Sequence, residues 1–299
     1  MPHSVNPPRS TFVSAQDGLR LHVREYGALT AAASPVVCLP GLTRTTADFD
    51  ALAPALAYGQ PSRRVAVIDS RGRGQSQYDG DPQNYNLAVE LADVISVLTA
   101  LEIGRAVFVG SSRGGLLSMM LALAQPTAIA GVVLHDIGPV IEPKGLARIR
   151  SYVGKVPQPG SLAEGAEILR RLFDAQFPKV TADQWLAAAR HTWKAEDGKF
   201  VPTYDVRLAC TLAEFDIERP PPPMWNEFDA LARVPVLVIR GANSDILSAA
   251  TVNAMRARHP GLAVIEVADQ GHVPFLDGTE LIERIAEFVR GCDAAGLRT

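Results

Sequence analysis

The sequence has little cysteine and no excess of charge of either sign. Its 299 residues include 3 cysteines, Cys38, Cys210 and Cys292, which lie far apart without a C-x-x-C pair or a histidine cluster beside them. That spacing favours neither a disulfide framework nor a metal site, and we expect a reduced, cytoplasmic protein without bound metal. With 29 basic against 32 acidic residues, no overall field favours nucleic acid or an anionic membrane as a partner.

Long apolar runs are also missing. Nowhere do roughly 18 apolar residues follow one another, and the segment from Met1 to Ser10 is polar where a secretion signal would be apolar. These absences argue against a membrane protein. The hydrophobic content of 47% is nevertheless enough for a large core. We therefore expect a folded protein whose partner is a small-molecule substrate.

Short apolar runs separated by helical patterns predict an α/β fold. Residues 11–23 alternate apolar and polar around Asp17-Gly18, which is typical of a β-hairpin. Further runs have the pattern of buried parallel strands, at 35–39, 64–68, 106–109, 131–134, 234–239 and 262–267. Helical patterns such as 87–101 separate most of them. The sequence predicts a mostly parallel, doubly wound sheet of about eight strands.

One interval, residues 137–228, breaks this alternation. It contains no convincing strand, and a compact sheet does not tolerate a structureless loop of that length. Apolar residues recur at helical spacing over 162–177. We therefore expect a helical cap domain at 137–228, inserted between two parts of one core domain, 1–136 and 229–299.

The strongest chemical signal is Gly110-Ser111-Ser112-Arg113-Gly114, a G-x-S-x-G motif directly after a strand pattern and before a helical one. So sharp a turn needs glycine on both sides, because side chains there would collide. The turn holds the serine hydroxyl above the sheet, beside a helix N-terminus that favours negative charge. Ser112 is the predicted nucleophile, since Ser111 lacks the flanking glycine spacing.

A serine nucleophile needs a base, which is usually histidine because its pKa lies near neutral pH. Of 6 histidines, His272 follows the last strand pattern, at the end of the sheet where loops converge. The others precede the core, end an earlier strand, or lie in the cap or in a turn: His3, His22, His135, His191 and His259. His272 is the predicted general base.

Two aspartates are candidates for the acid that orients His272. Asp245 follows the strand at 234–239, after the cap, and Asp136 follows the strand at 131–134. A carboxylate at such a strand end can accept the second imidazole hydrogen and stabilise the imidazolium formed during attack. We favour Asp245 as the acid. Asp136 is then a candidate for substrate binding at the cap entrance or for bonding loop amides.

With these residues the chain resembles the α/β-hydrolase family, specifically its capped members that cleave esters, lactones or carbon–carbon bonds. The family order of nucleophile, acid and histidine matches Ser112, Asp245 and His272. The resemblance covers nearly the whole chain. It implies an α/β-hydrolase fold with an inserted cap.

The resemblance also implies an oxyanion hole. Pro40-Gly41-Leu42 matches the family motif usually written His-Gly-x, with proline where histidine is frequent. By this match the backbone N–H groups of Leu42 and Arg113 would bind the oxyanion of the tetrahedral intermediate. The departure at Pro40 leaves the backbone donor intact.

Arg113 is unusual, because many relatives carry an apolar side chain directly after the nucleophile. In fluoroacetate-dehalogenase-like relatives an arginine here helps to hold a substrate carboxylate. A buried guanidinium needs an anionic partner, and that partner is either the ligand or an acid of the protein. Arg44 carries a similar suggestion. Ser112, in place of their aspartate nucleophile, argues against dehalogenation and epoxide opening.

Together these residues predict a serine hydrolase that cleaves a carboxylic ester of a small molecule through an acyl-enzyme, without a cofactor. A lactonase or a carbon–carbon bond hydrolase uses the same triad, and substrate choice lies in the side chains of the cap. A non-enzymatic small-ligand receptor on the same fold is the alternative from a different class. Turnover of short acyl esters distinguishes an enzyme from a receptor.

Overall fold

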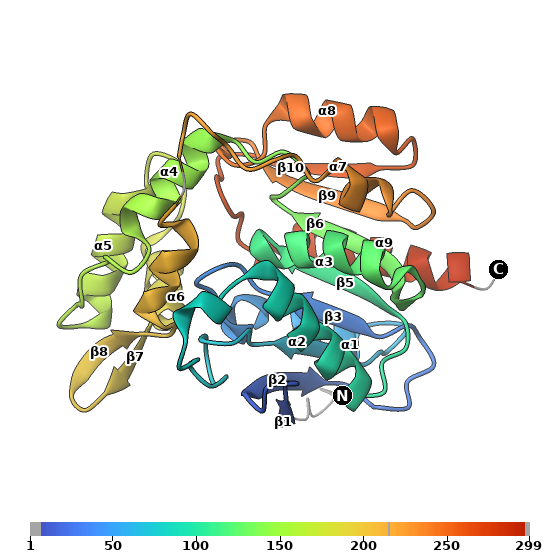
Figure 1. Cartoon of the computed structure of the whole chain (residues 1–299), viewed down its shortest axis with the longest axis horizontal. Coiled ribbons are helices and arrows are strands. Elements are labelled where there is room, and N and C mark those ends of the chain that lie inside the picture. Colours follow the sequence, from blue (N-terminus) through green and yellow to red (C-terminus); the bar gives the residue numbers. More distant parts are fainter. Residues whose placement is uncertain (1–6, 215, 297–299) are drawn as a thin grey trace.

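An eight-stranded sheet forms the centre of the protein, and the computed structural model describes residues 7–214 and 216–296 (Figure 1). The strand order is β1-β2-β4-β3-β5-β6-β9-β10, with β1 and β2 antiparallel to their neighbours and the other pairs parallel. The strands are β1 (Arg9–Ser14), β2 (Arg20–Tyr26), β3 (Val36–Leu39), β4 (Val65–Ile68), β5 (Ala106–Ser111), β6 (Ile129–His135), β9 (Val236–Gly241) and β10 (Ala263–Val267). The predicted sheet and its N-terminal hairpin are confirmed. Residues 1–6, which begin the polar N-terminal segment, lie outside the described ranges.

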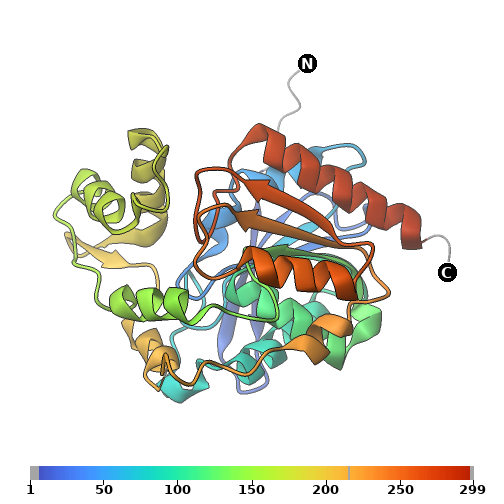
Figure 2. The ribbon, with the colours of Figure 1, turned by 90° about the horizontal axis from the view of Figure 1, so that it is seen from above.

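Two apolar layers cover the faces of this sheet. Val37 packs in the first layer and its neighbour Cys38 in the second, because successive side chains of a strand point to opposite faces. The first layer includes α2 (Leu87–Ala100), α3 (Arg113–Ala124), α7 (Trp225–Asp229) and α8 (Ala249–Arg258), and the second includes α1 (Leu52–Tyr58) and α9 (Thr279–Gly296). Figure 2 shows α8 and α9 on opposite sides of the sheet. Burial on both faces explains why the parallel strands are continuously apolar in sequence.

Most of the chain between β6 and α7 forms a separate group of helices beside the sheet (Figure 1). These are α4 (Pro143–Tyr152), α5 (Leu162–Phe173), α6 (Ala182–Thr192) and the 3-10 helix η4 (Val206–Leu212). The group has its own apolar cluster, which includes Leu169, Phe177, Trp185 and Trp193. The helices agree with the expected helical unit, whereas the domain bounds 1–136, 137–228 and 229–299 stay predictions. In the described part of the chain no helix is long and apolar enough for a membrane span.

The expectation that residues 137–228 contain no strand is wrong. β7 (Trp193–Glu196) and β8 (Lys199–Pro202) form an antiparallel hairpin outside the main sheet. Asp197 and Gly198 make its turn with φ of 49° and 75°. An Asp-Gly pair is a hairpin signal because both turn residues take positive φ. The strands themselves lack apolar alternation, since most of β7 is exposed.

Candidate active site

The turn between β5 and α3 holds Ser112 in a strained backbone conformation. Its φ is 50° and its ψ is −114°. A Cβ at Gly114 would lie 2.0 Å from the carbonyl oxygen of Leu39, and a Cβ at Gly110 would lie 2.5 Å from that of Gly114. Both positions therefore require glycine, for the steric reason that the G-x-S-x-G pattern implies.

His272 lies in the loop between β10 and α9 and contacts Ser112. Nε2 of His272 is 2.8 Å from Oγ of Ser112, which is within reach for transfer of the hydroxyl proton. The His272 side chain is only 6% exposed, so bulk water has little access to it. The structure thus brings together the two residues that the sequence predicts as nucleophile and base.

The carboxylate behind His272 is that of Asp136. Its Oδ2 lies 2.8 Å from Nδ1 of His272, and the Asp136 side chain is fully buried. Oγ of Ser244 and the backbone N–H of Gly241 donate further hydrogen bonds of 2.6 and 2.7 Å to the same carboxylate. Three donors, two from the end of β9 and the loop after it and one from the loop after β10, therefore fix the orientation of this carboxylate against the imidazole.

The prediction that Asp245 contacts His272 is wrong. Nε and Nη2 of Arg148, in α4, donate hydrogen bonds of 2.6 and 2.8 Å to the Asp245 carboxylate. Burial raises the pKa of Asp245, but the Arg148 guanidinium outweighs burial and holds this pKa below its ordinary value. The loop after β9 directs Ser244 toward Asp136 and places Asp245 against α4. Asp136, with a φ of 52° directly after β6, occupies the place against the imidazole instead.

A second serine–histidine contact lies beside the first. Oγ of Ser111 and Nδ1 of His135 are 3.0 Å apart, because these residues are opposite each other in the β5–β6 pair. Burial lowers the pKa of His135 to about 4, so its imidazole is neutral at pH 7. Sequence reasoning treats His135 only as a rival base. Its position next to the nucleophile depends on strand register, for which the sequence carries no local signal.

A cavity of about 280 Å³ is bordered by His272 and by residues of α4, α5 and α6. This volume is near the lower end of the range for small-molecule sites, roughly 300–1,000 Å³. One part of its wall is aromatic and comes from Phe173, Phe177, Trp185 and Phe275. Another part is polar and comes from Thr43, Arg44, Asp48 and His191. The arrangement can hold a small molecule with both apolar and polar groups.

The two arginines predicted from the sequence as substrate contacts have different surroundings. Nε of Arg113 lies 2.7 Å from Oε2 of Glu90, and Arg113 does not border the cavity among the described residues. Its anionic partner is therefore an acid of the protein. Arg44 borders the cavity and donates two hydrogen bonds of 2.7 Å to Asp48, while its Nη1 makes a longer contact of 3.4 Å with the Thr192 hydroxyl.

The backbone N–H groups of Leu42 and Arg113 lie just after β3 and β5. Gly41 is close to the nucleophile, since a Cβ on it would lie 3.6 Å from Cβ of Ser112. Arg113 is the first residue of α3, where N–H groups have no partner within the helix. Within residues 7–214 and 216–296, neither N–H donates to an acceptor of the protein. Both donors are available to an anion.

The sequence matches the model of the alpha/beta hydrolase family over residues 36–284. The chain belongs to the α/β-hydrolase family. A 3-hydroxybutyrate-oligomer hydrolase from Cupriavidus necator is 33% identical to it, over 92% of this chain and 95% of its own length. A crystal structure of an α/β hydrolase from Novosphingobium aromaticivorans has 39% identity and a TM-score of 0.86, with 95% of this chain and 98% of its own covered. A 2-(acetamidomethylene)succinate hydrolase from Mesorhizobium japonicum is 25% identical over 85% of each chain.

The predicted family and α/β-hydrolase fold are therefore confirmed. The relatives of this α/β hydrolase include hydrolases of small molecules and lipases. A hydrolase activity on a small molecule is accordingly supported.

Proposed function

We propose that this α/β hydrolase cleaves a carboxylic ester of a small molecule through an acyl-enzyme. The observation that carries the proposal is the chain of contacts from Asp136 through His272 to Ser112, each 2.8 Å long. A serine is a poor nucleophile at neutral pH unless a base takes its proton during attack. The contacts supply that base and a carboxylate to stabilise the imidazolium.

The reaction follows from this geometry in two stages. Oγ of Ser112 attacks the ester carbonyl while Nε2 of His272 takes the hydroxyl proton, and the Asp136 carboxylate stabilises the imidazolium that forms. His272 then gives the proton to the departing alcohol oxygen, which leaves an acyl group on Ser112. In the second stage His272 takes a proton from a water molecule as that water attacks the acyl carbon, and the imidazolium then returns the proton to Oγ of Ser112 as the carboxylic acid leaves.

An oxyanion hole at the N–H groups of Leu42 and Arg113 completes the proposal. The carbonyl oxygen becomes negative when the tetrahedral intermediate forms, and oriented donors stabilise that charge most in a site that excludes water. Two observations support these donors: neither N–H has an acceptor in the described part of the protein, and Arg113 begins a helix.

For the substrate we propose a short ester of a hydroxy acid. The relative from Cupriavidus necator, by its name, hydrolyses 3-hydroxybutyrate oligomers and matches nearly the whole chain. The small cavity has room for a short molecule, with an aromatic wall for its alkyl groups and a polar wall for its hydroxyl or carboxylate. On this proposal, the helical segment acts as a cap that selects the substrate, and Arg44 on the polar wall contacts the carboxylate.

A substrate panel tests the proposal. Wild-type protein and Ser112→Ala are assayed against short p-nitrophenyl esters, linear dimers and trimers of 3-hydroxybutyrate, lactones and vinylogous diketones. We expect turnover of the esters, highest for the hydroxy-acid oligomers, and a loss of about 10⁴-fold to 10⁶-fold in Ser112→Ala, the range found when a triad member is removed. Turnover restricted to lactones or diketones would assign the site to those bonds instead. Binding of these compounds without turnover would mean a receptor.

A further inference from the structure

A buried carboxylate in α2 bridges two arginines. Oε2 of Glu90 accepts a 2.7 Å hydrogen bond from Nε of Arg113, and Oε1 accepts a 2.8 Å bond from Nη1 of Arg73. Glu90 is 1% exposed and Arg73 is fully buried. Burying these three charges costs solvation free energy, and only well-aligned ion pairs and hydrogen bonds between them can offset that cost. We call Arg73, Glu90 and Arg113 the Glu90 bridge.

Each arginine of the Glu90 bridge is connected to one of the proposed oxyanion donors. Arg113 supplies one donor through its own backbone N–H. Nε of Arg73 donates a 2.7 Å hydrogen bond to the carbonyl oxygen of Leu42, the residue that supplies the other donor. One carboxylate therefore connects the turn after β5 with the loop after β3.

We infer that Glu90 is a positioning residue that holds the two halves of the oxyanion hole at a fixed separation. The inference rests on the proposed function, since it concerns the same oxyanion hole. Donors stabilise a transition state only when they are already aimed at the developing charge, and a shift of about 1 Å can cost about a hundredfold in rate. The Glu90 bridge supplies such rigidity, because its hydrogen bonds connect the two segments that carry the donors.

The charge of Glu90 separates a positioning role from an electrostatic one. Burial raises the pKa of Glu90, but the Arg73 and Arg113 guanidinium groups outweigh burial and keep this pKa below its ordinary value. Glu90 is therefore ionised at neutral pH. Two guanidinium groups against one carboxylate leave one formal positive charge, and loss of the Glu90 charge would raise it to two, so a fall in kcat in Glu90→Gln reports the position of the donors and not the charge near the oxyanion.

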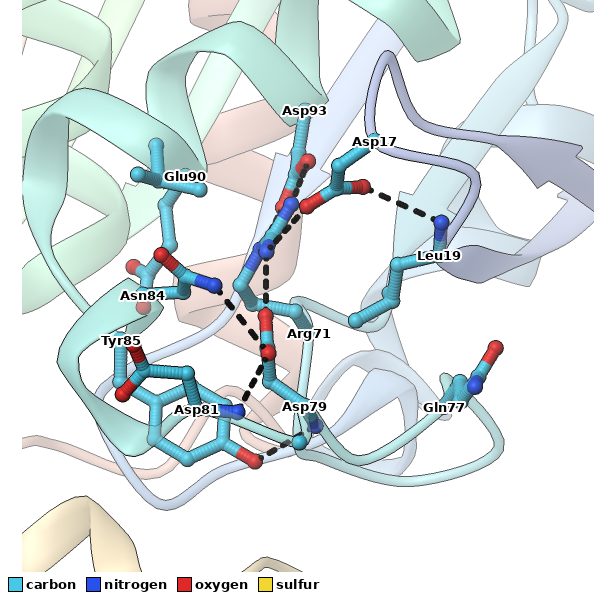
Figure 3. A network of polar contacts seen from close by, with 12 residues as sticks. Asp17, Leu19, Arg71, Gln77, Asp79, Asp81, Asn84, Tyr85, Glu90 and Asp93 are labelled. Carbon is cyan, nitrogen blue, oxygen red and sulfur yellow. Dashed lines mark hydrogen bonds and ion pairs between the residues drawn. The ribbon is translucent and has the colours of Figure 1, made fainter.

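A neighbouring network provides a matched control. Asp93, one helical turn from Glu90 on α2, binds the buried Arg71 with two hydrogen bonds of 2.6 Å (Figure 3). Arg71 is also bound by Asp79 and Asp17. The side chains of this second network contact neither Leu42 nor Arg113 in any described hydrogen bond, and the network meets the Glu90 bridge only through the backbone carbonyl oxygen of Arg71, which accepts a 2.6 Å bond from Nη1 of Arg73 in the described part of the chain. Asp93→Asn thus breaks a buried arginine–carboxylate pair of the same helix without touching the oxyanion loops.

The experiment compares Glu90→Gln with Asp93→Asn, using a neutral short ester that the wild type hydrolyses. We expect kcat to fall about 10-fold to 100-fold in Glu90→Gln with KM nearly unchanged, less than the roughly 10²-fold to 10³-fold loss for deleting an oxyanion donor. Asp93→Asn should lower the melting temperature, because the buried Arg71 loses a partner, but kcat should stay within about threefold because the Asp93 side chain does not reach the oxyanion loops. A boronic acid that forms a tetrahedral adduct on Ser112 should bind Glu90→Gln more weakly by the same factor as kcat/KM. The product alcohol, a ground-state ligand, should bind both variants equally.

Arg73→Lys gives a second measurement if Glu90→Gln does not fold. Lysine keeps the charge, but its single ammonium cannot reproduce the rigid fork that reaches both Glu90 and Leu42. Its kcat should also fall at least tenfold in protein that circular dichroism shows to be folded at the assay temperature. Unchanged kcat in a folded Glu90→Gln or in Arg73→Lys overturns the inference, as does an equal loss in Asp93→Asn. Failure of the wild type to hydrolyse any ester would instead count against the proposed function.

Discussion

Replacement of Asp136 by asparagine should abolish most of the turnover and leave the fold intact. The carboxylate accepts hydrogen bonds from His272, Ser244 and Gly241, all of which are donors. An amide has one accepting oxygen and a donating NH₂, so at least one of these groups must lose its bond or reverse its role. If Nδ1 of His272 becomes the acceptor, the proton moves to Nε2, and the imidazole can no longer take a proton from Ser112.

The size of this effect follows from the triad geometry. The corresponding change in a serine-protease triad lowers kcat about 10⁴-fold through the wrong tautomer. We expect a loss of about 10³-fold to 10⁴-fold here, which equals about 4–5.5 kcal/mol of transition-state stabilisation at about 1.4 kcal/mol for each factor of ten.

The assay measures steady-state hydrolysis of a short ester at pH 7, with Asp245→Asn as the control. Asp245→Asn breaks a partly exposed pair with Arg148, whose side chains are 17% and 22% exposed, so kcat should stay within about tenfold. Melting temperatures establish that both variants are folded. A larger loss of kcat in Asp245→Asn than in Asp136→Asn would refute the assignment of the acid.

Two further predictions concern His135 and the arginines. Because the pKa of His135 is about 4 in the folded protein and about 6.5 when unfolded, the unfolded chain binds more protons between these values, and stability should fall by up to about 3 kcal/mol as the pH drops through this window. Urea titrations at pH 7 and pH 4.5 should show a smaller difference in His135→Gln, and an equal difference would contradict this. Arg44→Met should raise KM for esters with a free carboxylate by about tenfold or more relative to neutral esters, as expected for one charged hydrogen bond. Arg113→Met should leave that ratio unchanged, and KM values for matched neutral and anionic esters decide both cases.

Local patterns predicted the features that depend on local sterics. Gly110 and Gly114 indicated the turn at Ser112 because no side chain fits at either position. The apolar runs indicated the parallel strands because both faces of the sheet are covered. These signals lie within a few residues of the element they describe.

The choice between Asp136 and Asp245 could not be made in that way. Both follow strands whose ends face the same edge of the sheet, and both come between nucleophile and histidine in the chain. The choice depends on the positive φ of Asp136 and on the path of the loop after β9, which turns Asp245 toward Arg148. Likewise, the partner of Arg113 is Glu90, 23 residues away in sequence, and only the packing of α2 against α3 brings them together.

The central claim, that Ser112 carries an acyl intermediate, is tested most directly by mass spectrometry of protein quenched during turnover of a short acyl ester. The account predicts that the acyl mass is added to the peptide containing Ser112, at that residue, and that no adduct forms in Ser112→Ala. An adduct on Ser111 or elsewhere, or full turnover by Ser112→Ala, would contradict it.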